Sequence, residues 1–152
     1  MSSSIATPTR HNAEQSARLG SACRPRRSNR SRRSLGRGVL ERLLAQSPRD
    51  VTVSVVSVGE LRTGAAKSSA PARTLARVES FLQPLTVLDF VRDDASVYAE
   101  VRARLERSGT PIGPLDTLIA AHALARKLTL VSNNEKELRR VKGLRVENWA
   151  KP

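Results

Sequence analysis

Three acidic side chains stand where an α/β protein would place a metal site. Glu60 and Glu137 each follow a strand-like apolar segment, with Asn134 close to the second, and Asp116 opens an alanine-rich segment. Ligands of parallel sheets gather beyond the carboxyl ends of the strands, where the next helices begin. Hard cations such as Mg²⁺ prefer oxygen ligands, and a bound cation can activate water and neutralise charge on a phosphate. We therefore expect Glu60, Asp116 and Glu137 to surround a divalent cation.

Each of these acids also has a purely structural interpretation. Ser57 and Glu60 have the spacing of a capping box, and Asn134 and Glu137 have the same spacing. Asp116 lies in a predicted first helical turn, where the helix dipole favours an acid by ~0.3–1 kcal/mol. Spacing alone favours the structural interpretation for any single residue, whereas their common position at strand ends favours a metal site. For His122, which lies among alanines, we expect a packed core residue rather than a ligand.

The elements that must position these residues alternate between strand and helix. β-Branched and apolar runs predict strands, and 3.6-residue periodicity predicts helices. Such alternation is typical of an α/β fold, with a parallel β-sheet flanked by helices on both faces. The predicted strands cover 51–56, 85–88, 128–132 and 144–149, and the predicted helices cover 39–45, 57–68, 71–82, 93–108, 114–125 and a short turn at 135–138.

Composition limits the classes of protein to which the chain can belong. Its 152 residues suffice for one ordinary domain, and an aromatic content of 3% predicts an aliphatic core. One cysteine, Cys23, excludes a disulfide framework. The longest apolar stretches fall far short of the ~20 residues that span a bilayer, so we expect no membrane association.

The net charge of +13 is concentrated at the N-terminus. Residues 1–38 contain nine arginines and one acid, Glu14, and show no apolar periodicity. We expect 1–38 to be a disordered basic Arg/Ser-rich arm and 39–152 to be the folded domain. Three interpretations of the arm stay open: nonspecific nucleic-acid binding, a transit-peptide-like segment, or a stretch with no selected role.

Three segments of the folded part resemble the conserved blocks of PIN-domain toxins of the VapC family. They are 54–68, 109–123 and 130–149, in the order and spacing of that family. The resemblance implies a PIN-like α/β fold and a Mg²⁺-dependent endoribonuclease, with Mn²⁺ as the alternative cation. It also implies an RNA substrate, a VapB-like antitoxin that holds the toxin of a type II toxin-antitoxin system inactive, a homodimer, and the bacterial cytoplasm as location.

The resemblance assigns roles to individual residues. Asp116, in its Asp-Thr-Leu-Ile-Ala-Ala context, matches the main metal carboxylate of the family, and Glu60 matches a second. Glu137 matches the fourth acidic position, with Asn134 beside it as a supporting group. Basic residues near the acids would hold the RNA backbone, although such charges on a helix face are also commonly just solvated; they are Arg62, Lys67, Arg102 and Arg104.

The chain departs from the family at its beginning. Family members open with a central strand that ends in Asp-Thr-Asn, whose Asp is a principal metal ligand. Residues 1–49 contain only Glu14 and Glu41 as acids, and neither follows a strand-like run. We therefore expect the first strand to be missing or replaced, through a frameshift or a mis-assigned start, and the activity to be impaired. The alternative is a catalytically inactive PIN remnant that binds a VapB-like antitoxin or RNA without cleaving; a DNA-binding arm has little support, because no helix-turn-helix or zinc-finger spacing is present.

Overall fold

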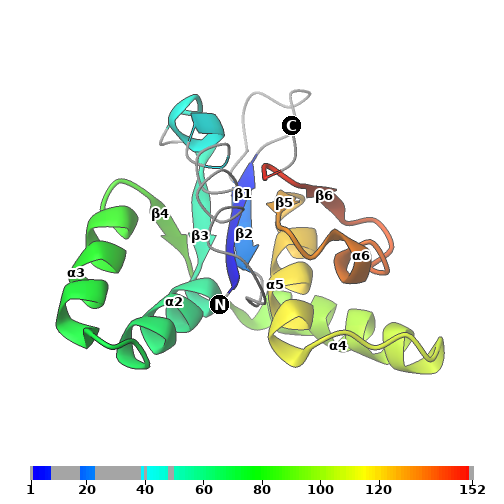
Figure 1. Ribbon diagram of the computed structural model, residues 1–152. Coiled ribbons are helices and arrows are strands. Elements are labelled where there is room, and N and C mark those ends of the chain that lie inside the picture. Colours follow the sequence, from blue (N-terminus) through cyan, green and yellow to red (C-terminus); the bar gives the residue numbers. More distant parts are fainter. Residues whose placement is uncertain (1, 8–17, 23–38, 40, 48–49, 151–152) are drawn as a thin grey trace.

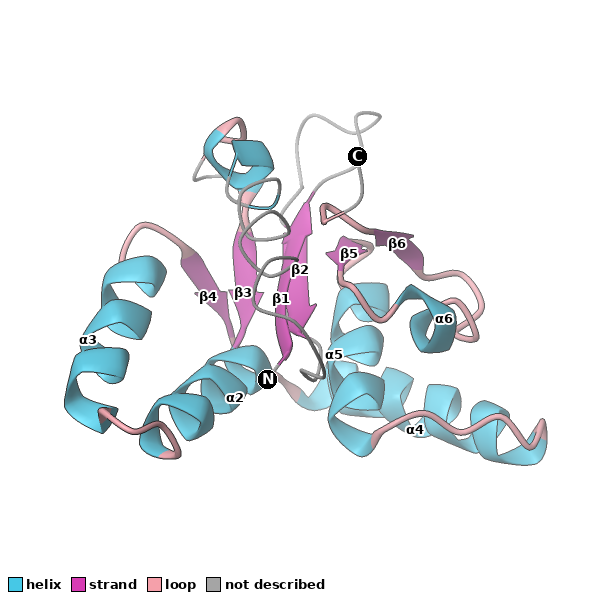
Figure 2. Cartoon of the chain, in the orientation of Figure 1, coloured by secondary structure: helices cyan, strands magenta, loops and turns pink. Residues whose placement is uncertain are grey.

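The computed structural model describes residues 2–7, 18–22, 39, 41–47 and 50–150. Residues 39 and 41–44 are helical, within the predicted first helix. From β3 on, successive strands are connected by one or two helices, as Figures 1 and 2 show. In chain order the elements are β1 (Ser2–Thr7), β2 (Arg18–Ala22), β3 (Thr52–Ser54), α2 (Val55–Ala66), α3 (Pro71–Leu82), β4 (Thr86–Leu88), α4 (Arg92–Arg107), α5 (Pro114–Ala125), β5 (Thr129–Val131), α6 (Glu135–Leu138) and β6 (Arg145–Glu147).

One six-stranded sheet runs through the molecule in the order β4-β3-β1-β2-β5-β6. The pairs β3–β4, β5–β6 and β2–β5 are parallel, whereas β1 is antiparallel to its partners β2, β3 and β5. In Figure 1, α2 and α3 lie on one side of the central strands, and α4, α5 and α6 lie on the other. The predicted α/β architecture is confirmed, with β1 as the antiparallel exception.

The centre of the sheet differs from the sequence prediction. Ser2–Thr7 and Arg18–Ala22, both within the expected disordered arm, pair with each other and fill the space between β3 and β5. Without them the facing edges of β3 and β5 would leave backbone groups unpaired, so backbone pairing outweighs the weak apolar signal of these stretches. Neither strand contains an acid. The rest of the predicted arm, Glu14 included, lies outside the described residues, and the boundary at residue 38 stays a prediction.

The start of α2 also differs from the prediction. The strand expected over 51–56 ends at Ser54, because Ser54 is the N-cap of α2 and its Oγ accepts a hydrogen bond from the amide of Val56 at 3.2 Å. The helix therefore begins at Val55, and the capping box expected for Ser57 and Glu60 is wrong. At α4 the N-cap residue is Val91, and the carboxylate of Asp94, three residues further on, accepts from its backbone amide at 2.8 Å.

The core is aliphatic, as the low aromatic content predicts. Its largest cluster joins α4, α5, β5 and α6, with Leu130 and Leu138 fully buried at its centre. Three alanines of α5 have no exposed surface, and their small side chains let α5 pack closely against its neighbours; they are Ala120, Ala121 and Ala123. This packing holds the N-terminal turn of α5 beside the end of β5. Among the described residues, no helix has the length and apolar character needed to cross a membrane.

Candidate functional site

Two of the predicted acids meet at one amide group. The Asn134 Nδ2 atom donates to Glu137 Oε2 at 3.0 Å and to Asp116 Oδ2 at 3.4 Å. Asp116 comes from the first turn of α5, and Asn134 and Glu137 come from the turn that follows β5. All three side chains are half-buried. The structure thus brings together the N-terminus of α5 and the N-terminus of α6, as expected for the carboxyl end of β5.

The backbone before α5 makes room for the Asp116 side chain. A Cβ atom at Gly113, the N-cap residue of α5, would lie 3.1 Å from Asp116 Oδ2. Pro114 follows at the first helical position, where its fixed φ suits the helix. Thr117 closes the turn, since its Oγ1 donates to the Gly113 carbonyl at 2.9 Å. The carboxylate of Asp116 therefore lies against the first turn of α5, which Pro114 and the hydrogen bond from Thr117 to Gly113 hold in place.

The end of β5 holds Asn134 in a similar way. The backbone amide of Asn134 donates to Ser132 Oγ at 3.1 Å, and the backbone amide of Ser132 donates to the backbone carbonyl of Glu147 at 2.8 Å. Leu138, which is fully buried, anchors α6 in the core. The backbone of Asn134 is thus held to Ser132, which follows β5 and is itself bonded to β6, and the side-chain amide of Asn134 lies between the two acids.

Glu60 occupies a different element from these residues. It lies half-buried in the middle of α2, a helix that contacts α5. In the part of the chain that the structure describes, no three His, Cys, Asp or Glu side chains are grouped closely enough to hold a metal together. Two of the three expected acids are therefore gathered at Asn134, and the participation of Glu60 stays a prediction.

The donor set around Asn134 has the chemistry that a hard cation requires. Two carboxylates share one neutral amide, so their negative charges lie close together at a half-exposed position. Carboxylate and amide oxygens are the ligands of Mg²⁺ and Mn²⁺, and Mg²⁺ keeps several water ligands. Asp116 and Glu137 would hold such a cation, with the side-chain oxygen of Asn134 as a further donor beside them.

Two of the four basic residues expected to contact RNA form ion pairs. Arg62 contacts Glu79 through Nε at 2.9 Å and Nη2 at 3.3 Å, which ties α2 to α3. Arg102 contacts Glu106 at 2.8 Å, and both pairs are exposed. Hydrogen bonds to these carboxylates raise the pKa of both guanidinium groups. Lys67 and Arg104 are also exposed, so all four cations remain at the surface.

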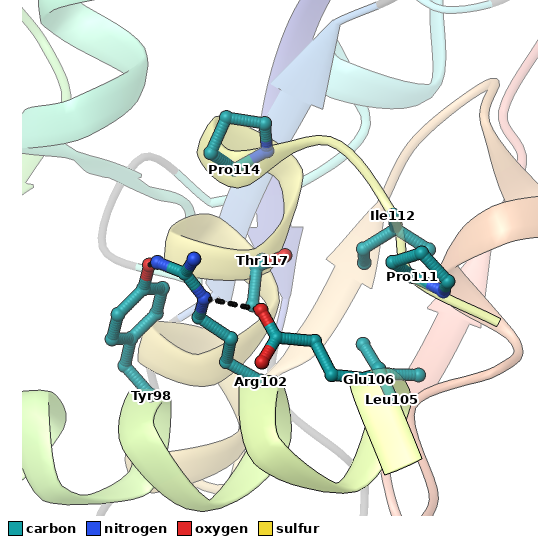
Figure 3. Close-up of a pocket in the computed structure, with 8 residues that line it drawn as sticks. All are labelled: Tyr98, Arg102, Leu105, Glu106, Pro111, Ile112, Pro114 and Thr117. Atoms are coloured by element: carbon teal, nitrogen blue, oxygen red, sulfur yellow. Dashed lines mark hydrogen bonds and ion pairs between the residues drawn. The ribbon is translucent and has the colours of Figure 1, made fainter. Parts of the chain in front are cut away.

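A small pocket of about 200 Å³ adjoins the first turn of α5. Figure 3 shows Arg102 between Tyr98 and Glu106 on α4, opposite the loop that leads into α5. The pocket wall is mostly apolar apart from these groups. Its lining residues are Tyr98, Arg102, Leu105, Glu106, Pro111, Ile112, Pro114 and Thr117.

A second polar group, which spacing alone did not indicate, lies at the other end of α5. It consists of Ser54, Asp94, His122 and Arg126, and we call it the Asp94–His122 cluster. Ser54 Oγ and His122 Nδ1 are 3.0 Å apart, and His122 Nε2 lies 3.5 Å from Asp94 Oδ2. Arg126 donates to both carboxylate oxygens of Asp94 at 2.9 Å. His122 has no exposed surface, so the predicted core position is confirmed.

The environment of the Asp94–His122 cluster explains its charge state. Burial lowers the pKa of His122, and this outweighs the opposite effect of Asp94, so the ring is neutral at neutral pH. Burial by itself would raise the pKa of Asp94, but the hydrogen bonds from Arg126 and Val91 lower it overall. Phe90 also packs edge-on against the imidazole, with ring centroids 5.3 Å apart. The cluster is closed to solvent around its histidine, so it is not itself a substrate site.

Comparison with known proteins places this fold in a family. Residues 31–144, which include Glu60, Asp116 and Glu137, match the PIN domain. The chain belongs to the PIN-domain family.

Close relatives narrow the assignment further. A Salmonella typhimurium protein named tRNA(fMet)-specific endonuclease VapC is 46% identical over 97 residues, which are 64% of this chain and 74% of the relative. Ribonuclease VapC2 of Haemophilus influenzae is 44% identical over 104 residues, 68% of this chain and 79% of the relative. In the crystal structure of DNA-bound VapBC from Salmonella typhimurium, one chain superposes with a TM-score of 0.70 at 43% identity, covering 74% of this chain and 84% of that one. Within the PIN-domain family the chain is therefore of the VapC type.

Proposed function

We propose that this VapC-type PIN domain is a divalent-cation-dependent endoribonuclease and the toxin of a toxin–antitoxin pair. One observation carries the proposal: Asp116 and Glu137 converge on the Asn134 amide at the end of β5, in a half-exposed position. The ribonuclease and endonuclease names of its relatives support the reaction class.

Each residue of the site has a distinct task in this proposal. Asp116 and Glu137 hold a Mg²⁺ or Mn²⁺ ion, and Glu60 contributes from α2. Asn134 orients both carboxylates, since its Nδ2 contacts an oxygen of each. When bound, the cation supplies an activated water and neutralises charge on the phosphodiester. Exposed cations of α2, Arg62 and its C-cap residue Lys67, attract the RNA backbone.

The partner belongs to the same proposal. Solved relatives are VapBC complexes, which supports a VapB-like antitoxin that binds this chain and holds it inactive. A homodimer, implied by the family resemblance, is checked by light scattering of the chain alone and with its antitoxin.

RNA cleavage with and without Mg²⁺ tests the activity. Initiator tRNA is a suitable first substrate, because the Salmonella typhimurium relative is named for it. We expect cleavage that needs Mg²⁺ and falls by orders of magnitude in Asp116→Asn and Glu137→Gln. Glu100→Gln, an exposed acid on α4, is the matched control and should cleave like the parent chain. Cleavage that survives Asp116→Asn would contradict the proposed site.

A second candidate function is a PIN domain that binds its antitoxin without cleaving RNA. One observation favours it: the strands β1 and β2, which fill the centre of the sheet, contain no acid that could serve as a further metal ligand. This candidate predicts antitoxin binding together with no Mg²⁺-dependent cleavage at any enzyme concentration.

A further inference from the structure

We propose that the Asp94–His122 cluster is a positioning device that fixes α2 against α5 and so sets the separation of Glu60 and Asp116. This inference rests on the proposed function, because it concerns the geometry of the same cation site.

Ser54 connects two helices through one oxygen atom. Its Oγ accepts from the amide of Val56 at the start of α2 and contacts His122 Nδ1 on α5 at 3.0 Å. The hydroxyl can donate to Nδ1 or accept from it, according to the tautomer of His122, and either arrangement leaves Ser54 Oγ bonded to both helices. The N-terminus of α2 is thereby tied to the C-terminal half of α5.

Asp94 and Arg126 connect a third helix, α4, to α5. The Asp94 carboxylate is 1% exposed and accepts from the amide of Val91 and from two nitrogens of Arg126. Arg126, the C-cap residue of α5, also donates to the Asp89 carbonyl at 3.3 Å. Three helices, α2, α4 and α5, are thus joined by polar contacts around one imidazole.

The imidazole is a costly way to join these helices. Among the described residues, His122 Nε2 makes no well-formed hydrogen bond: Asp94 Oδ2 lies 3.5 Å away, and the backbone of Asp89 is a further weak polar neighbour of the ring. A buried polar atom with only weak partners costs stability, so packing alone would favour an apolar residue at this position. Polar groups retained against stability are typical of sites that need a defined geometry.

Counted in residues, the contact between Ser54 and His122 is equally far from Glu60 and from Asp116. Glu60 is six residues beyond Ser54 on α2, and Asp116 is six residues before His122 on α5. At 1.5 Å per residue, each acid lies about 9 Å of helix axis from this contact. Because helices are stiff over so short a length, the contact fixes where Glu60 stands relative to Asp116. Loosening it should weaken cation binding without removing any ligand.

Mn²⁺ binding to the purified chain, followed by electron paramagnetic resonance, tests this inference without depending on activity. His122→Leu removes the contact to Ser54 and should weaken Mn²⁺ affinity about tenfold, the lower range found for groups that support metal ligands. His122→Asn keeps a polar atom near the position of Nδ1 and should restore most of that affinity. Ser54→Gly keeps a good N-cap residue but removes the hydroxyl, so it should weaken Mn²⁺ binding as His122→Leu does.

Leu43→Ala is the control for general destabilisation, because Leu43 packs in a cluster whose described members lie outside α2 and α5. It should lower the melting temperature and leave Mn²⁺ affinity unchanged. Equal weakening by Leu43→Ala and His122→Leu, or no weakening by either His122→Leu or Ser54→Gly, would overturn the positioning role. Asp116→Asn separates this inference from the proposed cation site. If the wild-type chain does not bind Mn²⁺, or if Asp116→Asn binds it equally well, the proposed cation site is wrong and this inference is wrong with it.

Discussion

The two ends of α5 carry polar groups of opposite character. At the C-terminal end, Asp94 is almost fully buried and is held by the guanidinium of Arg126. At the N-terminal end, Asp116 and Glu137 are only partly buried and share the neutral side-chain amide of Asn134. An acid paired with a cation in the interior fixes structure, whereas acids gathered around a neutral donor at the surface keep their affinity for an external cation. The same helix thus joins a structural cluster to a candidate reactive site.

The largest difference in stability should appear when one acid of each group is replaced by alanine. Asp94→Ala removes the acceptor of two Arg126 nitrogens and the Val91 amide, so the free energy of unfolding should fall by about 2–3 kcal/mol. Asp116→Ala should change it by less than about 1 kcal/mol, since the residue is half-exposed. Urea unfolding without divalent cations measures both. Similar losses in the two variants would remove the distinction between the two ends.

A smaller effect is expected from the turn that carries Asp116. Gly113→Ala suits the backbone, whose φ is −54°, but places a Cβ atom 3.1 Å from Asp116 Oδ2. The carboxylate must shift by a few tenths of an ångström, and the rate of RNA cleavage at saturating RNA should fall about tenfold. Gly59→Ala is the matched control, because its Cβ would meet nothing within 4 Å. Full activity in Gly113→Ala would show that the position of this carboxylate is not critical.

The pH dependence of stability sharpens the account of the buried end. The pKa of His122 is lowered by burial, so the unfolded chain binds a proton more readily than the folded chain. The contribution of His122 is therefore complete above its ordinary pKa of about 6.5 and is lost as pH falls below it, by at most about 1.4 kcal/mol per pH unit. Asp94, whose pKa is lowered, adds a further loss only below about pH 4.

Urea midpoints between pH 7.5 and 5 measure this contribution. His122→Asn should flatten the profile, while His11, the second histidine of the chain, stays in place in both proteins. A slope that is unchanged in His122→Asn would assign the effect to other groups.

The smallest effect is expected at the exposed ion pair between α2 and α3. Arg62→Ala breaks its contact with Glu79, and exposed pairs contribute little, so the melting temperature should move by no more than about 1 °C. RNA binding should weaken and lose part of its salt dependence, because the proposed function places Arg62 at the RNA backbone. Filter binding at two salt concentrations measures this, and Arg77→Ala on α3 is the control.

Local patterns in the sequence predicted those features that depend on neighbouring residues. The bounds of α3, α5 and α6 and the burial of His122 are as expected, whereas the cation site at Asp116 and Glu137 stays a prediction. The start of α2 differs from the prediction. Val55 and Val56 are β-branched and favour a longer strand, but the side chain of Ser54 caps α2 and ends the strand before them.

Features that depend on distant residues left no local pattern. Ser54 and His122 are 68 positions apart, and Asp94 and Arg126 are 32 apart, so only the fold brings them together. The strands β1 and β2 lack apolar alternation and are defined by the backbone groups of β3 and β5 that they pair with.

A crystal structure of the chain with Mn²⁺, located by anomalous scattering, tests the central claim most directly. We expect one Mn²⁺ ion bound to carboxylate oxygens of Asp116 and Glu137, with Glu60 contributing directly or through a water molecule, and no Mn²⁺ at Asp94. An ion ligated elsewhere, or density for Mn²⁺ that is unaffected by Asp116→Asn, would contradict the assignment of the reactive site to the N-terminal end of α5.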